Sequence, residues 1–162
     1  METKDLSRAY KELLAAAEAI TDVGPLAEAD RAQTDWLLAH IALSDRALAD
    51  AARQVLAGQE GRIDNASAMS KTEIARVISA TTHAERIDMV RRNARELIDV
   101  LERTPDSAAT ASVRARLVDR AGEVVFDCDL AWGAVVRMRA VEHIPGHAAT
   151  LASFLGPCTD QA

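Results

Sequence analysis

The sequence predicts a mainly α protein: a four-helix bundle with a small β-hairpin between the third and fourth helices. Glycine and proline are sparse, with 7 and 4 residues among 162, and 3% of the residues are aromatic. Such a composition favours helices over sheets. Apolar residues also recur at intervals of three and four along most of the chain, which is the helical period. One stretch, from Ser112 to Cys128, has the alternation and β-branched content of strands instead.

The length predicts one domain. A chain of 162 residues with 49% hydrophobic content can build one compact core but is short for two. We therefore expect a single bundle domain over residues 1–156 and a C-terminal tail over residues 157–162.

The first half of the chain contains two of the expected helices. The first runs from about Lys4 to Ile20, and the break at Val23-Gly24-Pro25 separates it from the second. The later part of the second helix extends from Thr34 to Leu56, and Gly58 stops it. A polar connection follows, from Gly58 to Ser70.

The second half contains the remaining elements. Ser70 and Glu73 have the spacing of a capping box, and the apolar period then continues to about Glu102, which predicts a helix of about 45 Å. The β-rich stretch from Ser112 to Cys128 predicts a hairpin that turns over Asp119 to Gly122. A fourth helix is expected from about Ala131 to Phe154.

Charge and hydropathy exclude several kinds of partner. The net charge of -6 repels a phosphate backbone, so nucleic acid is not expected. No run of about 20 apolar residues could span a bilayer, and the acidic start of the chain is unlike a signal peptide. We therefore expect a cytoplasmic protein without a membrane partner. The two cysteines, Cys128 and Cys158, lack the spacing of a zinc or redox motif.

Three of the four histidines form the candidate site. His143 and His147 are four residues apart, a spacing that places both rings on one face of a helix. His40 shares a helix face with Trp36 and Ala47, so it also lies on an inward stripe. Three neutral imidazoles could hold Zn²⁺, Ni²⁺, Fe²⁺ or Mn²⁺ and leave coordination positions open.

Two alternatives remain open at this stage. Buried histidines are often core residues whose ring nitrogens are simply hydrogen-bonded. Pro145, which lies between His143 and His147, could also break the helix and separate the two rings. The pair is therefore expected at a kinked or newly starting helix.

Other residues are candidates for the surroundings of the metal or for a substrate pocket. Asp64 and Asn65 fall in the connection after the second helix, where Asn65 could orient a substrate oxygen and Asp64 could support a ligand histidine. The alternative for both is a turn or a helix cap. Trp36 and Trp132 lie within a few helical turns of the histidines and are either core residues or part of a substrate pocket.

The histidine pattern resembles that of the DinB/YfiT-like superfamily of four-helix metalloproteins. The matching positions are His40 within Trp-Leu-Leu-Ala-His-Ile-Ala and the pair within Glu-His-Ile-Pro-Gly-His, just over 100 residues further on. The loop Arg62-Ile-Asp-Asn65 is similar to that of a subgroup common in actinobacteria. Relatives that use mycothiol often have a tryptophan at the position of Ala32, whereas here Trp36 follows one turn later.

The resemblance implies a metal-dependent enzyme that acts on a small electrophilic molecule. Transfer or isomerisation that uses a low-molecular-weight thiol such as mycothiol is the leading expectation. The alternatives are a hydrolase that activates water at the metal, and a non-catalytic protein that binds a secondary metabolite for self-resistance. Relatives of this size are often homodimers. Fold alone does not choose among these functions.

Overall fold

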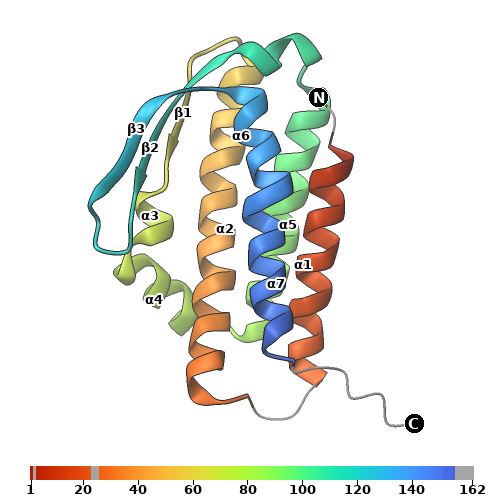
Figure 1. Ribbon diagram of the computed structural model, residues 1–162, viewed down its shortest axis with the longest axis vertical. Helices are drawn as coiled ribbons and strands as arrows, with labels where there is room; N and C mark the ends of the chain where they lie inside the picture. The colour runs from red at the N-terminus through yellow and green to blue at the C-terminus, as the bar shows by residue number, and fades with distance from the viewer. Residues whose placement is uncertain (2, 23–25, 156–162) are drawn as a thin grey trace.

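The computed structural model describes residues 1, 3–22 and 26–155. The predicted break at Val23-Gly24-Pro25 and the predicted tail, 157–162, lie outside the described residues. The mainly α prediction is confirmed: long helices dominate, and a small sheet lies at one side (Figure 1).

Four long helical runs lie side by side in Figure 1. They are α1 (Lys4–Asp22), α2 (Glu28–Leu56), α5 (His83–Arg103) and a last run made of α6 (Trp132–Met138), η2 (Arg139–His143) and α7 (Ile144–Ser153). Helix α2 packs on α5, and α1 packs on both α5 and α7. Apolar side chains on the facing stripes form one core, and the largest fully buried ones include Leu6, Leu13, Leu37, Leu38, Leu97, Leu101, Ile144 and Leu151.

The prediction of one long third helix is wrong. The segment forms two helices, α4 (Lys71–Ala80) and α5, because Thr81 is extended and Thr82 caps α5 in a capping box with Glu85. The predicted cap at Ser70 does begin α4, where the Ser70 hydroxyl accepts from the Glu73 N–H. Arg86 fixes the break, since it donates to the Thr81 carbonyl and pairs with Asp35 of α2 at 2.6 Å.

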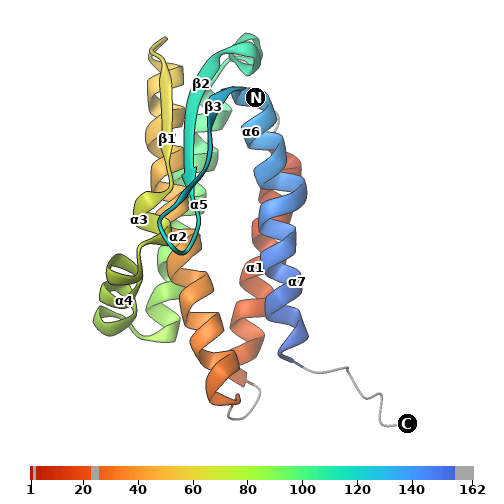
Figure 2. The same ribbon diagram turned by 60° about the vertical axis from the view of Figure 1, so that its left-hand side comes forward.

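The predicted hairpin is confirmed, but it belongs to a three-stranded sheet. Strands β2 (Ser112–Val118) and β3 (Val124–Ala131) are antiparallel, and β1 (Gly61–Asp64) pairs with β2 in parallel. The segment predicted as a polar connection therefore contains β1 and the short helix α3 (Ala66–Met69). A short 3₁₀ helix, η1 (Asp106–Thr110), precedes β2. Figure 2 shows the sheet in front of α2, with the hairpin tip toward α3 and α4.

The last helical run does not break at Pro145. Pro145 has no N–H to donate, so an α-helical hydrogen bond to the carbonyl four residues earlier cannot form. The chain accommodates this with the π-helical turn η2 directly before α7, at whose start Pro145 lies. Such turns are frequent at functional sites. None of the helices in the described part of the chain is both long and apolar enough to cross a membrane.

Candidate metal centre

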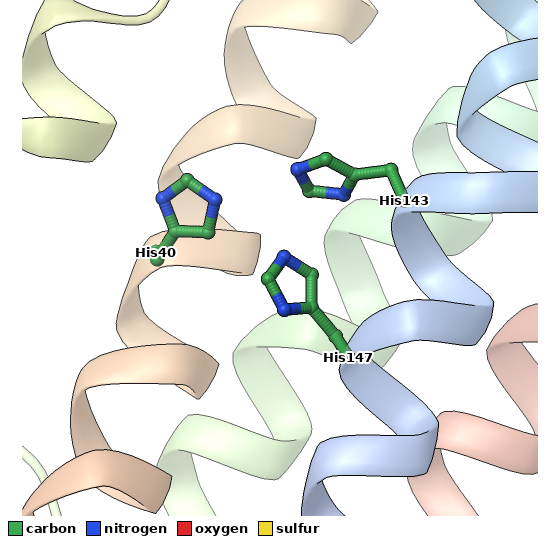
Figure 3. A group of neighbouring side chains, drawn as sticks. All are labelled: His40, His143 and His147. Carbon is green, nitrogen blue, oxygen red and sulfur yellow. The ribbon is translucent and has the colours of Figure 1, made fainter. Parts of the chain in front are cut away.

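Three histidine rings from two distant parts of the chain meet inside the bundle. His40 lies in the middle of α2, His143 ends η2, and His147 lies one turn into α7. One nitrogen atom from each ring can be chosen so that all three lie within 4.8 Å of one another. Figure 3 shows these nitrogens turned toward the space that the rings share. The structure thus brings together all three residues that the sequence singled out.

The ring of His40 is held in a defined orientation. Its Nδ1 lies 2.8 Å from the Ala68 carbonyl oxygen of α3, which can only accept a hydrogen bond. In the neutral ring Nδ1 therefore carries the proton, and Nε2 keeps its lone pair. Trp36 stacks on this ring with the centroids 4.9 Å apart and the planes 9° from parallel. These contacts aim a metal-ligating nitrogen at the other two rings.

The three imidazoles are neutral at physiological pH. Burial is the main cause that lowers the pKa of each ring. The positive charge of Arg139 and the neighbouring rings lower the pKa of His143 further, to about 2. The pKa of His147 falls to about 4, with contributions from His40 and Arg139 after burial. A neutral imidazole is the form that binds a metal.

A buried charged network lies directly behind His143. The Arg139 guanidinium is 5% exposed and pairs with Asp45, which is fully buried. Nη2 of Arg139 also lies 2.9 Å from Ser44 Oγ, and Nε lies 3.3 Å from the Tyr10 hydroxyl, which in turn donates to Asp45. Burial raises the pKa of Tyr10 and that of Asp45, although Arg139 opposes both shifts.

Arg139 also contacts the candidate ligand itself. Its Nη1 lies 2.8 Å from His143 Nδ1, and a guanidinium can only donate. A neutral His143 ring then carries its proton on Nε2, the nitrogen nearer the other rings. For a metal to bind there, the ring proton must move to Nδ1 and this Arg139 contact must be given up.

Sequence reasoning missed this network, although a signal was present. Asp45 follows Leu38 by seven residues and Ile41 by four, and precedes Leu48 by three, so it lies on the apolar stripe of α2. Arg139 follows Trp132 and Val135 by seven and four residues in the same way. A charged residue at a core position of each of two facing helices predicts a buried ion pair.

The other candidate residues are distributed differently. Asn65 binds the backbone of Val118 in β2 through both amide atoms, at 2.7 and 3.1 Å, and lines a cavity beside the histidines. Asp64 is exposed, accepts from the Ala66 N–H and pairs with Arg116. Asp64 therefore stabilises a turn, which was the alternative interpretation. The hydrogen-bond partner of His40 is the Ala68 carbonyl and not the Asp64 carboxylate.

Of the two tryptophans, Trp36 lies at the histidines and Trp132 lies in the hydrophobic core. Trp36 is part of the centre through its stacking on His40, and the Arg120 guanidinium of the hairpin turn covers the indole at 3.7 Å from the ring centroid. Trp132 is fully buried in the core beside Leu6 and Leu97, and no ring contact joins it to the three histidines. Its indole N–H has no hydrogen-bond partner among the described residues.

Comparisons with known proteins give no match for this chain. No family model, no curated protein and no solved structure matches it. The geometry of the centre and the sequence pattern are therefore the basis for the function of this protein.

Proposed function

We propose that this protein is a divalent-metal-dependent enzyme that acts on a small electrophilic molecule, by transfer or isomerisation with a low-molecular-weight thiol. The observation that carries the proposal is the cluster of three neutral imidazoles, with no carboxylate or thiol within it. Three nitrogen ligands are typical of catalytic zinc sites, which keep a fourth position open.

The donor set fits the proposed ion. Imidazole nitrogen suits Zn²⁺, Ni²⁺ and Fe²⁺ and accepts Mn²⁺, whereas Mg²⁺ and Ca²⁺ prefer oxygen ligands. His40, His143 and His147 would hold the ion. The ion would supply Lewis acidity, which lowers the pKa of a thiol or water molecule in its open coordination position.

The chain's own residues would position the reacting partners. The Ala68 carbonyl and Trp36 keep His40 in one orientation, and the ion pair of Arg139 with Asp45 fixes the helical turn that carries His143. Orientation of this kind reduces the entropic cost of bringing thiol and electrophile together.

We also propose that the fold belongs to the DinB/YfiT-like superfamily. The position of the hairpin before the last helical run and the placement of the histidines support this part of the proposal.

A non-catalytic binding protein is the second candidate. It is favoured by a mostly apolar cavity of about 210 Å³ beside His40 and His143, which could hold a hydrophobic metabolite without any reaction. A hydrolase remains the alternative enzyme, because water can take the same open position.

An activity assay separates these functions. The purified protein is incubated with a thiol and an electrophile such as 1-chloro-2,4-dinitrobenzene, with and without a chelator, beside His143→Ala and the control His83→Ala. The proposal expects thiol-dependent turnover that both the chelator and His143→Ala abolish, while His83→Ala keeps it. His83 lies outside the cluster, against the Ala17 carbonyl. Turnover without thiol would favour the hydrolase, and turnover unaffected by chelator and by His143→Ala would contradict the proposal.

A further inference from the structure

The cavity beside the histidines has a mostly apolar lining. It lies between α2, the inner face of the sheet and the last helical run, and it reaches His40 and His143. Most of its wall consists of apolar side chains from all of these elements, among them Leu48, Ile63, Leu117, Leu130, Val135 and Met138. Figures 1 and 2 show the three strands beside α2 and α6, where this space lies. A void of this size with an apolar wall suits an apolar ligand.

The charges around the cavity select against a charged ligand. Among the described residues, Arg139 is the one formally charged side chain in the wall, and its partner Asp45 is buried behind it. In the metal-free protein, an isolated charge moved from water into this lining would lose its hydration without gaining a counter-ion.

One end of the cavity nevertheless offers a hydrogen-bond donor. A guanidinium has five N–H groups, and Arg139 directs four of them to Tyr10, Ser44, Asp45 and His143. The fifth also belongs to Nη1, which lies 3.4 Å from His143 Nε2; because Nε2 carries the ring proton, it cannot accept this N–H. Ser44 Oγ already donates to the Ile41 carbonyl. An uncharged acceptor oxygen at this end would satisfy Arg139 and lie next to the three histidines.

We propose that this cavity binds the apolar body of a small, uncharged carbonyl compound, with its oxygen at Arg139 and its carbon chain between α2 and the sheet. The inference deepens the proposed function, on which it rests for what happens to the ligand, since it names the substrate class of the same site. The binding itself depends on the cavity.

The test uses a series of methyl ketones from 2-butanone to 2-octanone, titrated into the ¹⁵N-labelled protein as purified. Each buried methylene contributes about 0.8 kcal/mol, so affinity should rise about four-fold per methylene until the cavity is full. Hexanoate has a similar chain but a charged end, and in protein treated with a chelator it should bind at least ten-fold more weakly than 2-heptanone. The shifted amides should belong to residues near Leu48, Leu117 and Leu130.

Substitutions inside and outside the cavity wall test where the ketone binds. Ala47 lines the cavity and is half-buried, so Ala47→Phe should reduce 2-heptanone affinity at least ten-fold and the smaller Ala47→Met should reduce it less. Ala29→Phe, on the exposed start of the same helix, should leave the affinity unchanged. The ketone series on the unmodified protein keeps the test decisive if Ala47→Phe fails to fold.

The two proposals fail separately, because the metal content is measured on the same samples. Ketone binding that shows no dependence on chain length, or that survives Ala47→Phe in a folded variant, would overturn the cavity assignment even in metal-loaded protein. Equal binding of hexanoate and 2-heptanone in chelator-treated protein would overturn it too. Chain-length-dependent ketone binding in protein that takes up no metal would support the proposed ligand cavity and would contradict the proposed metal-dependent enzyme.

Discussion

At the scale of single residues, the centre depends on how each imidazole is held. His40 is fixed by the Ala68 carbonyl and by stacking on Trp36, whereas His143 contacts a guanidinium that already binds Asp45, Ser44 and Tyr10. Removing one partner of a buried ion pair leaves the other charged group without compensation, which destabilises far more than loss of a surface pair.

Replacing Arg139 should therefore destabilise the fold strongly. Arg139→Met leaves Asp45 buried and unpaired, and we expect the free energy of unfolding to fall by about 3–5 kcal/mol, measured by urea denaturation. Arg137→Met, on the exposed side of the same helical run, should stay within about 0.5 kcal/mol of the unmodified protein. The double variant Arg139→Met/Asp45→Leu should recover part of the lost stability. Equal stability of Arg139→Met and Arg137→Met would contradict the role of the ion pair.

The lowered pKa values of the histidines predict how stability depends on pH. In the unfolded chain histidine titrates near its ordinary pKa of about 6.5, but His147 titrates at about 4 and His143 at about 2 in the fold. Between these values the unfolded state binds more protons, so the stability of the metal-free protein should fall as the pH drops below about 6.5 and continue to fall toward 4.

Unfolding midpoints at pH 8, 6 and 4.5 check this dependence. The comparison protein carries glutamine at positions 40, 143 and 147, and its stability should fall less over the same range. An identical pH dependence in both proteins would show that the cluster titrates normally.

At the scale of elements, the local signals were sufficient for some segments and not for others. The ranges of α1, α2 and the last helical run agree with the predicted ranges because their apolar periods are local, and the hairpin is found where predicted except that β3 continues past Cys128 to Ala131. Strand β1 was missed since it is four residues long and pairs in parallel with residues about fifty positions later. The break at Thr81 was missed because apolar residues continue on both sides of it, although Thr82 and Glu85 form a capping box.

Glycine positions test the packing of two elements. Gly146 lies in α7, and a Cβ there would meet nothing within 4 Å, so Gly146→Ala should stabilise the protein by about 0.5–1 kcal/mol. A Cβ at Gly61 of β1 would lie 2.6 Å from Val113 Cγ1 and 3.0 Å from Val55 Cγ2. Gly61→Ala should therefore destabilise by about 1–3 kcal/mol. Thermal unfolding measures both, and a reversed order would contradict the packing of β1 between α2 and β2.

At the scale of the whole molecule, the three histidines connect parts of the chain that are far apart in sequence. An ion bound to α2 and to the last helical run binds the folded state and not the unfolded one, so it should stabilise the protein by about 2.7 kcal/mol at a free concentration of 100 times its Kd. Addition of Zn²⁺ should accordingly raise the melting temperature of the unmodified protein and of His83→Ala, but not that of His143→Ala. An equal rise in all three would place the bound ion elsewhere.

The three histidines of the candidate site could be predicted from the sequence, whereas the charged residues around them could not. His40, His143 and His147 lie on helical stripes, so the period alone predicts which way each side chain faces. Arg139, Asp45 and Arg120 required knowledge of which helices and strands pack together. Pro145 indicates that the helical run must adjust at this point, but the form of the adjustment, a π-helical turn with His143 and His147 close together, depends on the whole run.

If the three histidines together hold a divalent metal ion, elemental analysis of the purified protein will detect it. The unmodified chain and His83→Ala are measured beside His40→Ala and His147→Ala, each prepared in the same way and checked for folding. We expect about one ion per chain in the first two proteins and a loss of most of the metal in the last two. Equal metal content in all four proteins would contradict this expectation.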